Sequence, residues 1–146
     1  MTFGDGQFLI GGDGGTLAKR DAGAAAWAKA GDSGTTRRLF GGAIVGGTSL
    51  AVGWLGTVTV SKIGGAWRLA NGVEQVNIED VIHDGDRFLA VGKGGKVGLS
   101  ADGEAWAFHD SGTTAWLKHI TPGGGQYVAV GTRGTIITSA LSLIHI

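Results

Sequence analysis

The chain has 146 residues, and its 12 Lys plus Arg are balanced by 12 Asp plus Glu, so its formal net charge is zero. This balance gives no general attraction to nucleic acid or to an anionic membrane, and no apolar run is long enough to span a bilayer. The lack of cysteine excludes a disulfide framework and a thiolate zinc site. Thirty glycines against one proline, without a Gly-X-Y period, favour one folded domain of short strands joined by tight turns.

A segment of two apolar strands around a G-x-x-G turn occurs four times along the chain. The copies cover residues 8–17, 49–58, 88–97 and 127–136. Their first glycines are Gly12, Gly53, Gly92 and Gly131, and their second glycines are Gly15, Gly56, Gly95 and Gly134. The tryptophans Trp27, Trp67 and Trp106 follow nearly the same period, and the segment DSGTT at 32–36 recurs at 110–114. This regular period is the signature of a repeat architecture.

The third copy shows the elements of one repeat most clearly. Strands are expected over residues 76–83, 87–92, 95–100 and 106–109, with turns between them. Four short antiparallel strands in a repeat of about 40 residues are typical of a β-propeller blade. Residues 22–30 (AGAAAWAKA) have helical propensity, but the repeat places a turn and a fourth strand there, and we favour the repeat.

We therefore predict an all-β fold: a partial β-propeller of about four tandem four-stranded antiparallel blades, the first and last incomplete. The expected blades cover about 3–32, 33–71, 72–110 and 111–140, the first beginning at its second strand and the last ending after its third. Trp27, Trp67 and Trp106 are expected to pack between strands.

Residues 100–106 match the pattern S-x-D-G-x-x-W. Asp102 can accept hydrogen bonds from the backbone amides of its own turn, Gly103 can supply a positive φ, Ser100 ends the third strand, and Trp106 fills the gap between strands. The motif resembles the Asp-box, or BNR repeat, of sialidases and related propellers. Together with F-x-A-V-G-x-x-G, it resembles the photosystem II stability/assembly factor-like propellers. Residues 61–67 keep the pattern without its aspartate, and the first copy has an inserted residue before Trp27.

The resemblance implies a non-catalytic propeller scaffold that binds a protein partner, with no cofactor and no metal. It slightly favours a bacterial periplasmic or extracellular location. A fragment of a sialidase-like glycoside hydrolase or of a glycan-binding lectin propeller remains the alternative. Closed propellers of this kind have about six to eight blades, so the chain resembles about half of one. Residues 141–146 do not continue the repeat and match the translation of a transposon end used as a sequencing adaptor, so we treat them as a non-native-looking tail.

The variable positions of the G-x-x-G turns are the candidate binding residues. These turns are expected to share one face with the loops that link successive blades, where repeat scaffolds place recognition. The predicted ligand or partner site consists of Asp13, Arg37, Arg38, Trp54, Lys93, Trp116 and Arg133. Such a basic and aromatic patch suits a protein or an acidic ligand. Ordinary solvated turns are the alternative.

No catalytic constellation is predicted. A sialidase requires three converging arginines and a tyrosine nucleophile with a glutamate partner, but Tyr127, the single tyrosine, occupies the strand position of Phe8 and Phe88. The histidines lack ligand-like spacing, and Glu79, Asp80, Asp84 and Asp86 indicate a solvated hairpin rather than a cation site. Half a propeller leaves a blade face and a strand edge uncovered, which predicts self-association.

Overall fold

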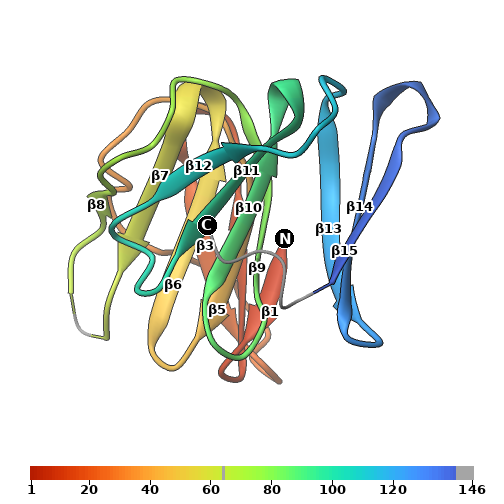
Figure 1. Cartoon of the computed structure of the whole chain (residues 1–146). Coiled ribbons are helices and arrows are strands. Elements are labelled where there is room, and N and C mark those ends of the chain that lie inside the picture. Colours follow the sequence, from red (N-terminus) through yellow and green to blue (C-terminus); the bar gives the residue numbers. More distant parts are fainter. Residues whose placement is uncertain (64, 141–146) are drawn as a thin grey trace.

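The computed structural model describes residues 1–63 and 65–140, and these form four antiparallel β-sheets in chain order (Figure 1). The first sheet contains β1 (Thr2–Gly4), β2 (Gln7–Gly11), β3 (Leu17–Asp21) and β4 (Ala28–Lys29). The second contains β5 (Leu39–Val45), β6 (Thr48–Gly53), β7 (Thr57–Ser61) and β8 (Arg68–Leu69). The third contains β9 (Ile78–His83), β10 (Phe88–Gly92), β11 (Lys96–Ser100) and β12 (Ala107–Asp110). The fourth contains β13 (Leu117–Gly123), β14 (Gln126–Gly131) and β15 (Ile136–Ala140).

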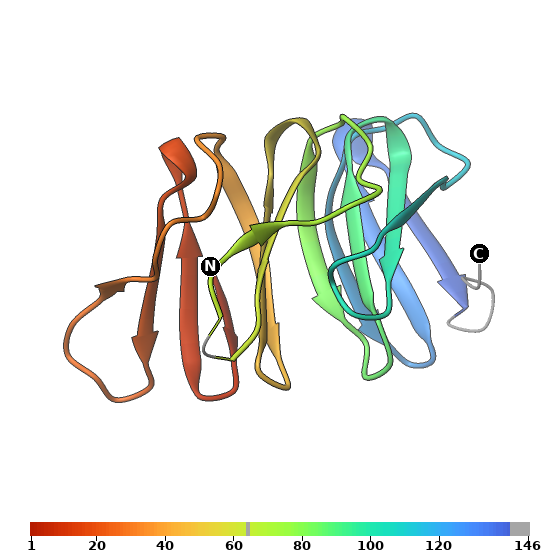
Figure 2. The ribbon, with the colours of Figure 1, turned by 90° about the vertical axis from the view of Figure 1, so that its left-hand side faces the viewer.

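Each sheet is one blade of a partial β-propeller, as the repeat predicts. Within a sheet the strands pair in sequence order, and the sheets stand side by side along the chain (Figure 2). The first strands of successive blades contact one another, β1 with β5, β5 with β9 and β9 with β13. We refer to the sheets as blades 1 to 4.

The four G-x-x-G segments adopt one conformation. Each folds as a 3-10 turn between the second and third strands of its blade: η1 (Asp13–Gly15), η2 (Trp54–Gly56), η3 (Lys93–Gly95) and η4 (Thr132–Gly134). The glycine before each turn is extended, with φ between −157° and −172° in all four. The glycine that ends each turn has φ between 68° and 72°. The equivalence of these four sites confirms that the chain repeats as one structural unit.

In the first three turns, the second glycine also marks where the turn meets the next blade. A Cβ atom at Gly15 would lie 1.9 Å from the carbonyl oxygen of Thr35, and one at Gly95 would lie 1.8 Å from that of Thr113. At Gly56 the corresponding distance, to Glu74, is 2.0 Å. Each of these glycines therefore lets the backbone leading into the following blade come into direct contact with the turn.

In the first blade, one sequence prediction is confirmed and another is wrong. Residues 22–30 contain no helix and include β4, as the repeat predicts. The expectation that the first copy begins at its second strand is wrong, because Thr2–Gly4 pairs with β2 as a short first strand. Its three residues pair in the register Thr2 with Leu9 through Gly4 with Gln7, which is enough to form a ladder. The predicted tail at 141–146 lies outside the described residues.

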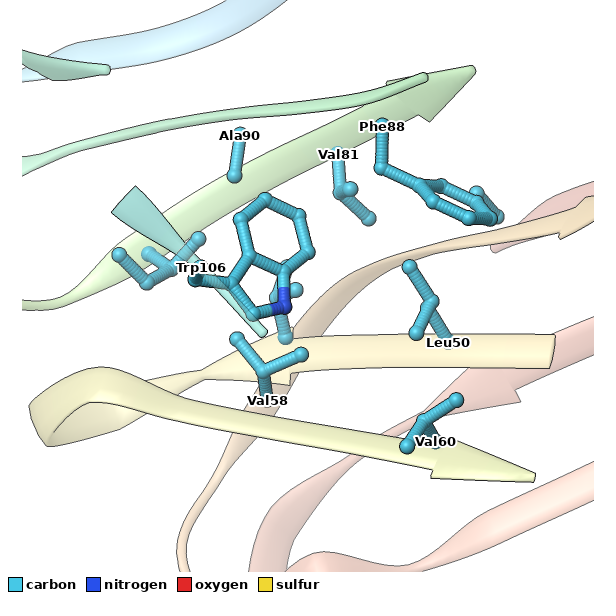
Figure 3. Packing of buried hydrophobic residues seen from close by; sticks show 10 residues of the cluster. Leu50, Val58, Val60, Val81, Phe88, Ala90 and Trp106 are labelled. Atoms are coloured by element: carbon cyan, nitrogen blue, oxygen red, sulfur yellow. The ribbon is translucent and has the colours of Figure 1, made fainter. Parts of the chain in front are cut away.

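Three apolar clusters lie between successive blades. Leu9 and Leu17 of blade 1 pack with Leu39 and Trp67 of blade 2, and a second cluster joins blades 2 and 3 around Trp106 (Figure 3). The third joins Leu89, Val91, Val97 and Leu99 of blade 3 to Leu117, Ile120, Tyr127 and Ala129 of blade 4. The continuous apolar strands therefore result from burial on both faces of a blade.

The prediction that all three repeated tryptophans are packed is wrong for Trp27. Trp67 and Trp106 are buried against the preceding blade, whereas Trp27 is 39% exposed and its ring contacts Phe8 and Arg20 of its own blade. Blade 1 has no preceding blade in this chain, so the side chain at this position lacks the apolar surface on which the other two rest.

No helix in residues 1–63 and 65–140 has the length and apolarity needed to cross a membrane.

Candidate functional site

Four turns and three loops form one end of the molecule, at the upper edge of Figure 2. We call this end the rim; its turns are η1 to η4 and its loops are residues 32–38, 71–77 and 110–116. Hydrogen bonds join turn to loop within blades 2, 3 and 4: Trp54 N to Arg38 O at 3.0 Å, Lys93 N to Asn77 O at 2.9 Å and Thr132 N to Trp116 O at 2.9 Å. A bond between blades, from Gly56 N to Val76 O at 2.7 Å, joins η2 to the next loop. The rim is thus a continuous, backbone-linked surface whose variable side chains point away from a constant frame.

Four of the predicted binding residues come together where blades 1 and 2 meet. Arg38 forms an ion pair with Asp13 at 2.7 Å, and both side chains are exposed. Arg37 donates a hydrogen bond from Nη1 to the carbonyl oxygen of Leu55 at 3.0 Å. Trp54 projects beside them with 47% of its surface exposed. Since Asp13 neutralises Arg38, this group is less basic than the sequence suggests.

A second group gathers around Trp116 at the start of β13. Its indole N–H donates to Glu79 Oε1 at 2.8 Å, and Lys118 Nζ lies 3.7 Å from the ring centroid. Lys93 Nζ reaches to 5.6 Å from the same centroid, which is within the range of a cation–π contact. Lys118 also pairs with Glu79 at 3.3 Å. Sequence reasoning missed Lys118 and this role of Glu79; the signal for Lys118 was its place two residues after Trp116 in the sequence.

Arg133 stands apart from both groups. It is exposed at the centre of η4 and has φ of 59°. In the part of the chain that the structure describes, no ion pair involves Arg37, Lys93 or Arg133. The positive charges of these three rim residues are therefore not neutralised by a carboxylate among the described residues.

A groove of about 740 Å³ runs beside Arg37. It lies between the loop at 32–37, the turn η2, the outer strands of blade 2 and the loop that follows β8. Thr35, Arg37, Leu55, Leu69, Asn71 and Gln75 are among its lining residues. Its walls offer both hydrogen-bonding groups and apolar side chains, which is a surface that suits an extended polypeptide segment.

Hydrogen bonds within the turn at residues 100–106 engage the side chains of Ser100, Asp102 and Trp106. Asp102 Oδ1 accepts hydrogen bonds from the amides of Glu104 at 2.8 Å and Ala105 at 3.1 Å, while Ser100 Oγ accepts one from Gly103 N at 2.8 Å. Gly103 has φ of 84°, and Trp106 donates its indole N–H to the carbonyl oxygen of Gly103 at 2.9 Å. The carboxylate of Asp102 is therefore engaged by the backbone of its own turn.

Of the carboxylates expected to form a solvated hairpin, Asp80 and Asp84 instead bind the following blade, whereas Asp86 is exposed. Asp84 accepts a hydrogen bond from the hydroxyl of Tyr127, and its side chain is only 8% exposed. Asp80 accepts one from the amide of Ile120 at 3.1 Å, and burial raises the pKa of Asp80. The hairpin prediction is wrong for these residues because strand β13 of blade 4 covers this face of β9.

Tyr127 is core, as its strand position predicts, and 2% of its surface is exposed. Its hydroxyl donates a hydrogen bond to the carboxylate of Asp84. Among residues 1–63 and 65–140, no three or more His, Asp or Glu side chains gather in a way that could hold a metal ion.

Comparison with known proteins identifies the fold alone. No family model and no curated protein match the chain. Among solved structures, the computationally designed proteins Ika8 and Ika4 align with TM-scores of 0.74 and 0.75, at 16% and 13% identity. The alignments cover 95% and 94% of this chain, but 44% of Ika8 and 87% of Ika4. YCF48 bound to a D1 peptide aligns with a TM-score of 0.69 at 16% identity, over 91% of this chain and 48% of that one. The chain thus spans less than half of Ika8 and of YCF48.

Proposed function

We propose that the chain is a non-catalytic propeller scaffold that binds an acidic, extended segment of a partner protein at the rim. The observation that carries this proposal is the contrast between frame and side chains. The four turns share one backbone conformation, yet they present Asp13, Trp54, Lys93 and Arg133 at equivalent or adjacent positions. A constant frame with variable exposed residues is the usual arrangement of a recognition surface on a repeat scaffold.

Charge and aromatic surface define the expected partner. Arg37, Lys93 and Arg133 are cations that can pair with acidic side chains, and Trp54 offers an exposed ring of the kind enriched at binding hot spots. The groove beside Arg37 can hold the backbone of the same segment. The structure of YCF48 with a D1 peptide supports peptide binding by this fold, and with the resemblance noted in the sequence it favours an assembly-factor-like role. No comparable observation favours a glycosidase.

A displayed library of short random peptides, selected against the whole chain, tests this proposal. We expect enrichment of peptides that combine acidic and aromatic residues. Their affinity should fall roughly tenfold or more in Trp54→Ala and in Lys93→Glu. Lys29→Glu, the same charge change on the exposed strand β4 of blade 1, serves as the matched control and should leave binding unchanged. Selected peptides without charge bias, or peptides equally sensitive to Lys29→Glu, would rule out the rim as the site.

We also propose that copies of the chain associate head to tail through the outer faces of blades 1 and 4. Aligning Gly53 with Gly131 relates Leu50, Val52 and Val58 to Val128, Val130 and Ile136. The first three are fully covered by blade 3, whereas Val130 is 38% and Ile136 69% exposed. Phe3 and Trp27 are exposed on blade 1. Because each blade interface in the chain pairs such faces, a second copy is the surface that fits them.

A further inference from the structure

A cavity of about 190 Å³ lies between blades 3 and 4, beside the outer edge of β15. Both apolar and polar side chains from the two blades line it. Val97, His109, Ile120, Tyr127, Ala129 and Ile137 belong to this lining. Nε2 of His109 is buried and has no hydrogen-bond partner within the described residues. A buried polar atom without a partner is costly, so this cavity is a place where a bound group would be stabilised.

The equivalent space between blades 2 and 3 is filled by a tryptophan of the chain itself. The alignment that places Gly92 on Gly131 relates Val97, Ile120, Tyr127 and Ala129 to Val58, Val81, Phe88 and Ala90. Those four residues form one buried cluster with Trp106, whose ring lies among them in Figure 3. The cavity between blades 3 and 4 therefore lies at the position equivalent to that of the Trp106 indole ring.

A second tryptophan follows the same pattern between blades 1 and 2. Trp67 is buried there and donates its indole N–H to the carbonyl oxygen of Ala30 at 2.9 Å. A Cβ atom on the neighbouring Gly31 would lie 3.5 Å from the Trp67 ring. Gly31 comes directly before the first DSGTT segment, and His109 comes directly before the second. His109 therefore lies where the tryptophan of the next blade would rest.

The strand that follows each of these two buried tryptophans is the fourth strand of its blade. After Trp67 and Trp106 the chain forms β8 and β12, which pair antiparallel with β7 and β11. The equivalent strand β15 pairs only with β14 in the described part of the chain. Among the described residues no strand pairs with the outer edge of β15, which lies beside the cavity, and such an edge can accept an added strand.

We propose that this groove binds, in trans, an extended segment of another protein in which a tryptophan precedes a short β-strand. The tryptophan occupies the cavity, and the residues after it pair antiparallel with β15. Residues 141–146 contain neither a tryptophan nor an Asp-Gly pair. Asp110 and Ser111 of the rim loop at 110–116 also line the cavity, but the site does not depend on the function proposed for the rim.

The register also specifies which residue the bound strand carries two positions after its tryptophan. In blade 3 this residue is Phe108, whose ring lies 2.6 Å from the position of a Cβ atom on Gly98, so only glycine fits beneath it. In blade 2 it is Leu69, which pairs with Thr59. Blade 4 has Ile137 at the position of Gly98 and Thr59, and a β-branched residue there favours leucine over phenylalanine in the partner.

Two peptides copied from the chain are the probes for this site. The first has the sequence of residues 65–71 (GAWRLAN) and the second that of residues 104–110 (EAWAFHD). Each is labelled with a fluorophore and titrated with the whole chain, and binding is followed by fluorescence anisotropy. We expect the first peptide to bind saturably and more tightly than the second. Replacing its tryptophan by alanine should weaken binding roughly tenfold or more.

Variants of the chain then locate the bound peptide. Ala129→Trp fills the cavity and should abolish binding, while Ile137→Gly should reverse the preference in favour of the peptide with phenylalanine. Val130→Ser, on the opposite face of β14, is the matched control and should leave peptide affinity unchanged. Circular dichroism and thermal melts establish that each variant is folded; if Ala129→Trp is not, the reversal by Ile137→Gly decides.

Three results would overturn the proposal. These are affinity that does not depend on the tryptophan, binding that survives in folded Ala129→Trp, and binding lost in Val130→Ser. The last result would place the peptide on the face proposed for self-association, which light scattering of the same variant measures separately.

Discussion

The hydroxyl group of Tyr127 on β14 donates a hydrogen bond to the carboxylate of Asp84, in the turn between β9 and β10 of the preceding blade. The same carboxylate accepts bonds from the amides of Asp86 at 2.8 Å and Arg87 at 2.9 Å. Burial alone would raise the pKa of Asp84, but the bond from Tyr127 and the two amides together lower it. One polar contact therefore links the hairpin of blade 3 to the core of blade 4.

We expect Tyr127→Phe to destabilise the chain by about 1.5–3 kcal/mol near neutral pH, the range for hydrogen bonds to charged groups. The ring itself should be tolerated, because Phe8 and Phe88 occupy the equivalent position in other blades. Since the pKa of Asp84 is lowered in the folded state, its contribution to stability is present above the unfolded pKa of about 3.9 and is lost as pH falls through the folded pKa. Urea unfolding at several pH values should show the two proteins converging in acid; a constant difference would contradict this assignment.

Gly94 and Gly95 provide a matched test of why the turns need glycine. Both have φ of 72°, but a Cβ atom at Gly94 meets nothing within 4 Å, whereas one at Gly95 would lie 1.8 Å from the carbonyl oxygen of Thr113. Gly94→Ala should therefore lower the free energy of unfolding by only about 1–2 kcal/mol, the cost of holding alanine in the left-handed conformation. Gly95→Ala should cost clearly more, because the next blade must move. Chemical denaturation of both variants measures the difference, and equal losses would show that contact between blades is not the constraint.

Trp106 and Trp27 occupy equivalent positions but differ in burial. Trp106→Ala should lower the free energy of unfolding by about 3–5 kcal/mol, because it leaves a cavity between blades 2 and 3. Trp27→Ala removes a ring that is 39% exposed, and we expect a loss of about 1 kcal/mol or less. Urea titrations followed by far-UV circular dichroism compare them. Similar losses of unfolding free energy for the two variants would mean that Trp27 is covered in solution. Head-to-tail association would also cover Trp27. The comparison is therefore made at the lowest practicable protein concentration.

Head-to-tail association should depend on the outer face of blade 4. Size-exclusion chromatography with light scattering should show the chain shifting from monomer to larger species as its concentration rises. Ile136→Ser should shift this equilibrium toward monomer, since Ile136 is 69% exposed on that face. Ile63→Ser removes another exposed isoleucine away from it and serves as the control. A chain that remains monomeric throughout, or equal effects of both substitutions, would exclude the proposed interface.

The sequence predicted the parts of the fold that depend on local backbone chemistry. The G-x-x-G turns were predicted because a positive φ and a close backbone approach both require glycine. The turn at 100–106 was predicted because its aspartate and glycine form the local hydrogen bonds and the positive φ of the turn. The exposure of Trp27 depends on whether a blade precedes it, which no feature near residue 27 encodes.

The polar contacts between blades were not predictable from spacing. The local sequence around Asp80 and Asp84 is typical of a solvated hairpin. They accept hydrogen bonds from Ile120 and Tyr127 because β13 packs against β9. At the rim, the ion pair of Asp13 with Arg38 joins residues from separate repeats through the docking of two blades. Side chains of opposite charge were identified individually, but their pairing is a property of the stacked arrangement.

Within the described residues, the hydrogen bonds and apolar clusters of this molecule join each blade to its immediate neighbours. Stability in such an array is approximately a sum of unit and nearest-neighbour terms, so the two terminal units are each held from one side only. Amide hydrogens in β1 to β4 and in β13 to β15 should then exchange with solvent through local opening, while those in β6 and β10 require the rest of the array to separate. Loss of structure should proceed inward from both ends, with the contact between the second and third sheets the last to open.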